Sequence, residues 1–207
     1  MLNTSTSHRW ARVRTSTTTI NTSPRLGASL IVPQLYLSDY FTAQDSSQLS
    51  RLGITHVISV LEFDVQIPEF IHEGNRMHIR IADRPDSDIL IHLEKTTEFI
   101  RMAIKENKDN CVLVHCFQGV SRSATVVCAY LVATAGMRAM QSIGFVQSKR
   151  KVVCPNNGFR QQLEMYMYSN YSAFMNPPKK DVGSEGITAR IRSLSSHSDR
   201  AKTEDVP

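Results

Sequence analysis

VHCFQGVSRS, residues 114–123, places a cysteine directly after a run of apolar residues and follows it with a glycine-containing loop. An arginine flanked by two serines then opens a segment with the pattern of a helix. A strand, a sharp loop and a helix in this order gather backbone N–H groups at the amino-terminal end of the helix, where the helix dipole favours negative charge. The stretch therefore predicts a site for an anion beside a nucleophilic side chain.

The segments around this stretch alternate between the patterns of strands and those of helices. The run CVLVH, Cys111–His115, is apolar almost throughout, as expected for a strand that is covered on both faces. Further strands are expected at 28–37, 56–61 and 77–82, and helices at 43–52, 89–105, 122–135, 138–148 and 157–172. This alternation predicts an α/β fold: a three-layer α/β/α domain with a mostly parallel central sheet and a C-terminal helical layer. In such a sheet the functional loop lies at the carboxyl end of a central strand, which is where VHCFQGVSRS falls.

The loop that follows the strand has the composition of a cradle for a tetrahedral dianion. Gly119 permits the backbone geometry that aims successive N–H groups into one concavity. The same concavity stabilises a thiolate, which makes Cys116 a candidate nucleophile rather than an inert core residue. Arg122 can direct two guanidinium donors onto two phosphate oxygens, and the hydroxyl of Ser123 is placed to reach the sulfur.

Composition and charge narrow the class of protein. The chain has a formal net charge of +5, but residues 28–172 hold fourteen Lys or Arg and fourteen Asp or Glu, so the excess lies at the two ends. This balance gives nucleic-acid binding little support, and no apolar run approaches the length of a membrane span. Cys111, Cys128 and Cys154 form no CxxC pair and are interpreted as unreactive thiols in a reducing compartment. The basic run Lys149–Lys151 is interpreted as a solvated helix end, with the docking of an acidic or doubly phosphorylated substrate as the alternative.

Changes in composition along the chain predict three regions. Residues 1–27 are rich in Ser, Thr and Arg and are expected to form a disordered leader, residues 28–172 a folded domain, and residues 173–207 a disordered polar tail. The leader also has the composition of a mitochondrial targeting segment, which is kept as an alternative. Apart from this mitochondrial alternative, we expect the protein to be a monomer in the cytoplasm, the nucleus or both.

The spacing H-C-x5-R-S, from His115 to Ser123, resembles that of the cysteine-based protein phosphatases, and specifically of their dual-specificity branch. The resemblance extends over about residues 28–172 and includes LIVPQLYLSDYFTA, LGITHVISV, GVSRSATVVCAYL and KRKVVCPNNGFRQQLEMY. The motif is specific in this setting because a strand precedes it and a helix follows it. The resemblance implies the fold of that family, a catalytic domain and a phosphorylated protein as the substrate.

The same resemblance implies a role for each residue of the loop. Cys116 would attack phosphorus and form a cysteinyl-phosphate intermediate. His115 would orient the loop, and Ser123 would assist the departure of the thiolate in the second step. The phosphate oxygens would be held through the transition state by the loop residues Phe117, Gln118, Gly119, Val120, Ser121 and Arg122.

Two residues outside the loop complete the site that the resemblance implies. Asp83 matches the general acid, which would protonate the leaving group and then activate water. Asp86 and Asp88 lie in the same loop as Asp83 and are rival candidates for the general acid, although Asp88 suits the N-cap of the helix that follows. Asn156 matches a position that supports the loop from outside. No metal or other cofactor is expected, because arginine and backbone amides already supply a positive field.

Several functions compete with the hydrolysis of phosphotyrosine, phosphoserine and phosphothreonine. A phosphoinositide phosphatase is expected to carry lysines in the loop, where Phe117, Gln118 and Val120 stand. A phosphoprotein-binding adaptor on this fold typically lacks the cysteine or the arginine, and a rhodanese-type sulfur carrier fits Ser123 less well. Tyrosine-only phosphatases carry a tryptophan in the acid loop, whereas the one tryptophan here is Trp10. A shallow cleft with dual specificity is therefore expected.

Overall fold

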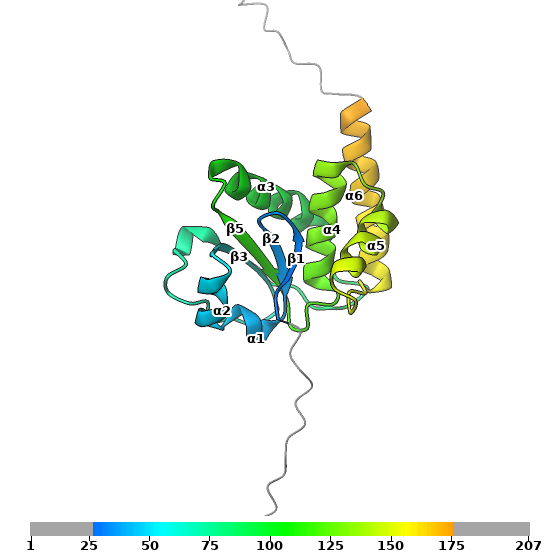
Figure 1. Ribbon diagram of the computed structural model, residues 1–207. Helices are drawn as coiled ribbons and strands as arrows, with labels where there is room; N and C mark the ends of the chain where they lie inside the picture. The colour runs from blue at the N-terminus through cyan, green and yellow to red at the C-terminus, as the bar shows by residue number, and fades with distance from the viewer. Residues whose placement is uncertain (1–26, 176–207) are drawn as a thin grey trace, which may run out of the picture.

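The centre of the sheet is β5, Cys111–His115, which pairs in parallel with β2, Leu35–Ser38, on one side and with β3, Ile54–Val60, on the other (Figure 1). Outside these, β1, Ser29–Val32, runs antiparallel to β2, and β4, Arg76–Ile79, runs parallel to β3. The strand order is β1-β2-β5-β3-β4. The mostly parallel sheet is confirmed, and β5 is its central strand.

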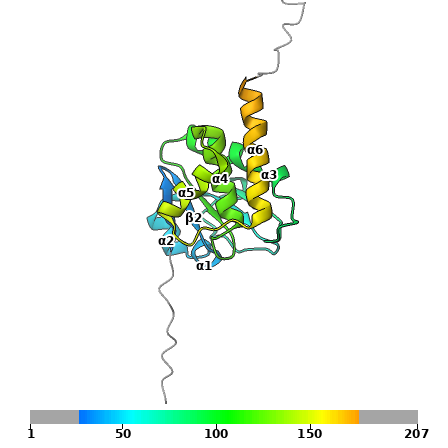
Figure 2. The same cartoon turned by 90° about the vertical axis from the view of Figure 1, so that its right-hand side faces the viewer.

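The computed structural model describes residues 27–175, and within them the helices divide between the two faces of the sheet. The helical elements are α1 (Tyr40–Ala43), α2 (Ser46–Arg51), the one-turn 3-10 helix η1 (Glu73–Asn75), α3 (Leu90–Glu106), α4 (Arg122–Ala135), α5 (Ala139–Lys149) and α6 (Asn157–Met175). Figure 2 shows α4, α5 and α6 grouped on one side of the molecule. The α/β fold with a C-terminal helical layer is therefore confirmed.

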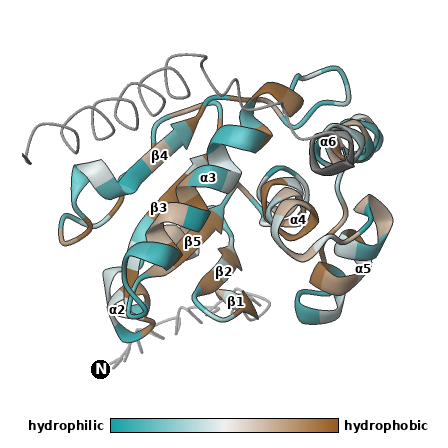
Figure 3. Ribbon diagram, turned by 90° about the horizontal axis from the view of Figure 1, so that it is seen from above, coloured by the Kyte–Doolittle hydropathy of each residue, from teal (hydrophilic) through white to brown (hydrophobic). Residues whose placement is uncertain are grey.

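Burial on both faces of β5 explains its continuous apolar sequence. Val112 and Val114 belong to the main core, which the sheet forms with α3 to α6. Leu113 points to the opposite face and packs in a smaller core with residues of α1, α2 and the segment that follows β3. In Figure 3 the hydrophobic colour is strong on β5, between the helical layers. A strand covered on both faces carries its loop to the edge of the sheet without exposing an apolar surface.

The single strand expected over residues 28–37 is wrong, because β1 and β2 form a tight antiparallel hairpin. The chain reverses at Pro33, which has no N–H to offer a sheet, and at Gln34, which has a φ of 67°. The side chain of Gln34 donates through Nε2 to the carbonyl of Asn110 at 2.7 Å. This contact fixes the turn beside the start of β5, so that β2 runs parallel to β5 and ends beside the predicted anion site.

The helix expected over residues 43–52 is confirmed as the shorter α2, and a separate short helix, α1, precedes it. Each begins after an aspartate whose carboxylate accepts a hydrogen bond from the backbone three residues on: Asp39 from Thr42 at 2.8 Å and Asp45 from Gln48 at 3.0 Å. Such N-caps start a new helix, so the expected helix begins after Asp45 rather than at residue 43. The other expected helices are confirmed within a few residues at each end.

The leader and the tail predicted from composition fall almost entirely outside the described residues. Their boundaries at 27 and 173 therefore stay predictions. Within residues 27–175, no single helix is long and apolar enough to cross a membrane; α4 and α5 reach that length and composition only as a pair bent by 119°.

Candidate active site

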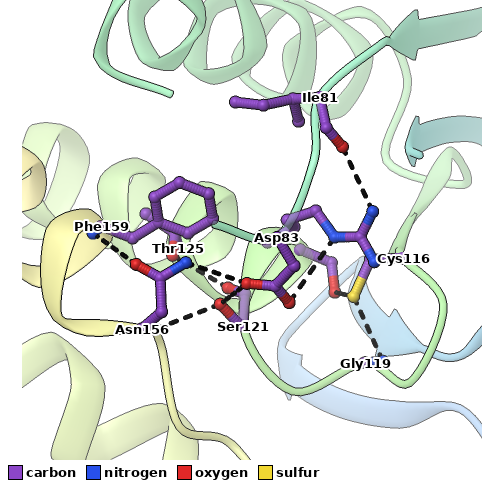
Figure 4. Close-up of polar contacts among 10 residues, drawn as sticks. Ile81, Asp83, Cys116, Gly119, Ser121, Thr125, Asn156 and Phe159 are labelled. Atoms are coloured by element: carbon purple, nitrogen blue, oxygen red, sulfur yellow. Dashed lines mark hydrogen bonds and ion pairs between the residues drawn. The ribbon is translucent and has the colours of Figure 1, made fainter. Parts of the chain in front are cut away.

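The sulfur of Cys116 lies at the bottom of the loop between two hydrogen-bond donors (Figure 4). Sγ accepts from the backbone N–H of Gly119 at 3.2 Å and from the hydroxyl of Ser123 at 3.1 Å. The residue as a whole is buried, with 2% of its surface exposed. Donors directed at sulfur stabilise its anionic form, which is the nucleophilic one. Ser123 therefore lies where the sequence places it, within hydrogen-bond reach of the thiol.

The close turn of the loop requires glycine at position 119. Gly119 has a φ of 67°, which lies in the left-handed region. A Cβ atom on this residue would lie 2.5 Å from the carbonyl oxygen of Ser38 and 2.8 Å from Nη2 of Arg150. Any side chain at this position would push the loop away from β2 and would move the N–H that reaches the sulfur.

Arg122, the first residue of α4, is buried beside the thiol, and one of its N–H donors makes no hydrogen bond to the described residues. Its Nη1 donates to the carbonyl of Ile81 at 3.2 Å, and the residue is only 7% exposed. Its Nε is buried without a hydrogen-bond partner among the described residues, at 3.6 Å from a carboxylate oxygen of Asp83. Buried donors are nearly always paired, so this guanidinium is arranged for an acceptor such as a phosphate oxygen.

His115, at the end of β5, is a neutral imidazole. Burial is the main cause that lowers its pKa, from 6.5 to about 4. Its Nε2 is hydrogen-bonded to Oγ of Ser59 on the neighbouring strand β3, at 2.7 Å. His115 is thus held as an uncharged bridge between β5 and β3, next to the nucleophile.

Asp83 is the acid that reaches the loop. Its Oδ1 accepts hydrogen bonds from the hydroxyl of Ser121 at 2.6 Å and from Nδ2 of Asn156 at 2.9 Å. Figure 4 shows this carboxylate between the loop and the start of α6. A third of its side chain is exposed, so the carboxyl group can also meet a ligand that enters from solvent.

The two rival aspartates make other contacts. Asp86 pairs with Arg84 through two hydrogen bonds, of 2.8 and 3.1 Å, and these bonds lower the pKa of Asp86. Asp88 accepts from the N–H of Ile91 at 3.4 Å, which is a weak contribution to the start of α3. The geometry therefore favours Asp83 as the acid that the sequence predicts.

Asn156 connects the acid, the loop and α6. Besides its bond to Asp83, its backbone N–H donates to Oγ of Ser121 at 3.1 Å, and its Oδ1 accepts from the N–H of Phe159 at 2.9 Å. We call the loop that carries Asp83, residues 80–89 between β4 and α3, the acid loop. It touches α6 closely, because a Cβ on Gly158 would lie 1.9 Å from the carbonyl oxygen of Pro85. Asn156 thus holds Ser121 and Asp83 in one arrangement from outside the loop.

The interpretation of Lys149–Lys151 as a solvated helix end is wrong for its middle residue. Arg150 is 1% exposed and donates from Nε to the carbonyl of Gly119 at 3.0 Å and from Nη2 to that of Gln118 at 3.3 Å. Its Nη1 donates to the carbonyl of Gly27 at 2.8 Å. Burial lowers the pKa of Arg150, and the carboxylate of Asp39, 4.0 Å away, opposes that shift. Arg150 therefore supports the back of the loop, which no local signal in the basic run indicates.

Gln162 is a second residue that the sequence does not single out. Its Oε1 accepts from the N–H groups of Ile89 and Leu90 at 2.8 and 2.9 Å, and its Nε2 donates to the carbonyl of Ser87 at 2.8 Å. These bonds satisfy backbone groups at the start of α3, the role that the sequence gives to Asp88. Gln162 thereby ties α6 to the end of the acid loop.

The other three cysteines are free thiols without a place in the loop. Cys128 is buried in α4, and burial raises its pKa to about 12. Burial also raises the pKa of Cys111, while Cys154 is exposed and accepts a contact from Nη2 of Arg160 at 3.1 Å. Their surroundings agree with the interpretation of Cys111 and Cys128 as unreactive.

Replacement of Arg150 tests its support of the loop. We expect Arg150→Met to lower both stability, by about 2 to 4 kcal/mol, and phosphate binding, because several carbonyls lose a charged donor. Arg150→Lys should recover part of the stability and little of the binding, since an ammonium cannot reproduce the planar fork. Urea unfolding and the dissociation constant for inorganic phosphate measure the two effects.

Lys151→Met is the matched control, because Lys151 is the exposed neighbour of Arg150. It should change neither the stability nor the affinity for phosphate. Equal effects of the substitutions at 150 and 151 would contradict the role given to Arg150.

Comparison with known proteins agrees with this geometry. Residues 35–169 match the family model described as "Dual specificity phosphatase, catalytic domain". Dual specificity protein phosphatase 15 of Mus musculus is 36% identical over 144 residues, which are 70% of this chain and 59% of that protein. Dual specificity protein phosphatase 13B of Mus musculus is 38% identical over 138 residues, 64% of this chain and 69% of that protein. The chain thus spans less than two thirds of the first of these relatives.

Solved structures give the same result. The crystal structure of DUSP15 superimposes with a TM-score of 0.65 at 34% identity, over 70% of this chain and 90% of that one. The human tyrosine phosphatase-like serine/threonine/tyrosine-interacting protein also gives a TM-score of 0.65 at 34% identity, over 71% of this chain and 99% of its own. These matches confirm the predicted three-layer fold. Together with the match of residues 35–169, they establish that the chain belongs to the dual specificity phosphatase family of the cysteine-based protein tyrosine phosphatase superfamily.

Proposed function

We propose that this protein is a protein phosphatase that hydrolyses phosphotyrosine, phosphoserine and phosphothreonine through a phosphocysteine intermediate. The observation that carries the proposal is the position of the Cys116 sulfur. It accepts hydrogen bonds from Gly119 and Ser123 at the start of α4. The buried guanidinium of Arg122 beside it has a donor, Nε, without a hydrogen-bond partner among residues 27–175. A nucleophile and a buried cation at a helix amino terminus suit a phosphate dianion.

In the first step the Sγ of Cys116 attacks phosphorus while the bond from phosphorus to the substrate oxygen breaks. Asp83 gives its proton to that oxygen, so that the substrate leaves as a neutral phenol or alcohol. Arg122 and the loop amides hold the remaining phosphate oxygens, whose charge is spread in the transition state. A thiolate and a protonated carboxyl group are thus consumed, and a phosphocysteine and a carboxylate are formed.

In the second step water attacks the phosphocysteine. The carboxylate of Asp83 takes a proton from the water, and the bond between sulfur and phosphorus breaks. The sulfur leaves as a thiolate, which the hydroxyl of Ser123 stabilises from 3.1 Å. Inorganic phosphate is released and both groups return to their starting protonation states, so the cycle needs no further reactant.

The relatives and the loop composition support this function over its alternatives. The matched proteins include those named dual specificity protein phosphatase 15 and 13B, and the tyrosine-protein phosphatase yvh1 of Schizosaccharomyces pombe. The exposed side chains of the loop are Phe117 and Gln118, and neither offers the cation that extra phosphates of an inositol ring need. A binding adaptor does not need the nucleophile, whereas here Cys116 is held by two donors.

The setting that we propose is a monomer acting on phosphoproteins in the cytoplasm, the nucleus or both. Support comes from the four cysteines, which are free thiols. Thiols of this kind persist where glutathione keeps proteins reduced. A single chain also encloses the main core, from the sheet to α6.

Replacement of the nucleophile tests the proposal. The protein should hydrolyse p-nitrophenyl phosphate in the presence of EDTA, because arginine and amides supply the positive field. Cys116→Ser should abolish the reaction, since a hydroxyl is a far weaker nucleophile at neutral pH. Cys154→Ser, at the exposed cysteine, is the matched control and should keep full activity. Turnover by Cys116→Ser, or a requirement for a divalent ion, would rule out the proposed mechanism.

Replacement of the acid tests the role of Asp83. Asp83→Ala should lower kcat on a phosphotyrosyl peptide by roughly 100-fold, the usual contribution of a general acid. The loss should be smaller on an aryl phosphate with an acidic phenol, because that leaving group departs without a proton. Asp86→Ala, in the same loop, should stay within about twofold of the original protein. Similar losses for both substrates, or a larger loss in Asp86→Ala, would reassign the acid.

A further inference from the structure

Four aromatic residues surround the mouth of the loop and form what we call the aromatic rim: Tyr40, Phe41, Phe63 and Phe117. Phe117 touches the other three, with ring centroids 6.0 Å from Tyr40, 6.4 Å from Phe41 and 6.3 Å from Phe63. Tyr40 also meets Phe63 edge to face at 5.6 Å. Three of these rings are nonetheless exposed: 43% for Phe117, 45% for Phe63 and 48% for Phe41. A contiguous group of exposed aromatic rings is a common sign of a binding surface.

The topology of the sheet places the aromatic rim at the catalytic loop. Tyr40 and Phe41 follow β2, Phe63 follows β3, and Phe117 follows β5. These are three adjacent parallel strands, so all four residues lie beyond the carboxyl edge at which such sheets bind ligands (Figure 1). The rim is also fastened to the loop, because the N–H of Tyr40 donates to the carbonyl of Phe117 at 3.1 Å.

Phe117 joins the phosphate site to the aromatic rim. Its backbone lies in the loop directly after Cys116, while its ring is exposed among the other aromatic residues. The group attached to the phosphate oxygen must therefore leave the loop next to these rings. In phosphotyrosine that group is a phenyl ring, which makes offset or edge-to-face contacts with other rings. In phosphoserine and phosphothreonine it is an aliphatic carbon next to the main chain, which makes no such contact.

From this arrangement we infer that the aromatic rim binds the phenyl ring of phosphotyrosine and gives this site a preference for phosphotyrosine over phosphoserine and phosphothreonine. The inference rests on the proposed function and refines its substrate class. The rings of the aromatic rim come from the segments that follow β2, β3 and β5, whereas the tryptophan of tyrosine-only phosphatases stands in the acid loop.

The Cys116→Ser variant should bind a phosphopeptide without cleaving it. Its affinity for phosphopeptides therefore tests the inference separately from catalysis. Two peptides of identical sequence, one with phosphotyrosine and one with phosphothreonine, are titrated by calorimetry. We expect the phosphotyrosyl peptide to bind roughly tenfold more tightly, as two or three aromatic contacts imply. Adding Phe63→Ser should remove most of this difference by weakening the phosphotyrosyl peptide alone, and Phe63→Leu should remove part of it.

Phe70→Ser is the matched control, because Phe70 is a 52% exposed phenylalanine in the same segment and makes no ring contact with the aromatic rim among the described residues. It should leave both affinities unchanged, and the thermal midpoints of all variants verify that they are folded. Equal affinity for the two peptides, equal weakening of both by Phe63→Ser, or binding of neither would overturn the inference. So would a dimer that Phe63→Ser dissociates without any change in peptide preference. If Cys116→Ser prefers phosphotyrosine while the original protein hydrolyses neither peptide, the proposed function fails and the aromatic rim stands.

Discussion

The sulfur of Cys116 accepts hydrogen bonds from the N–H of Gly119 and the hydroxyl of Ser123, and the surrounding structure is arranged so that both donors reach it. Gly119 can approach only because it has no side chain to meet β2, and Ser123 is in place because α4 begins one residue earlier. The strand that carries the sulfur is buried on both faces, so it cannot shift to relieve the loop. The reactive atom is therefore fixed by the core rather than by flexible surface contacts, which is how a site is kept preorganised.

A buried cation completes the loop from behind. A guanidinium loses its hydration when buried, and this cost is offset only if its donors are paired. Arg150 pairs them with carbonyls of the loop and of Gly27, and its positive charge stabilises the negative charge that gathers on the ligand side. The loop thus has a cation on each side: Arg122 in front, with a donor left for phosphate, and Arg150 behind, with its donors bound to carbonyls. Both residues carry the same guanidinium group, and only their hydrogen-bond partners distinguish the phosphate-binding role of Arg122 from the supporting role of Arg150.

Much of this arrangement follows from local sequence. CVLVH predicts the central strand, Gly119 the tight loop, and the helix from Arg122 the anion site, because each depends on neighbouring residues alone. Arg150 could not be predicted in this way, since a basic run at the end of a helix is usually solvated, and only tertiary packing brings it against Gly119. Gln162 takes the place expected for Asp88 for the same reason, across a separation of more than seventy residues. The aromatic rim was also missed, because its rings come from three separate strands and share no motif.

Detection of a phosphoryl group on the sulfur of Cys116 is the most direct test of the proposed mechanism. Ser123→Ala removes the hydroxyl that stabilises the departing thiolate, so the second step should slow and the intermediate should accumulate. The variant is mixed with an aryl phosphate, quenched in acid within the first turnover, digested and mapped by mass spectrometry. We expect phosphate on the peptide that contains Cys116 and on no other cysteine. Turnover without phosphate on that peptide, or phosphate on a different residue, would contradict the mechanism.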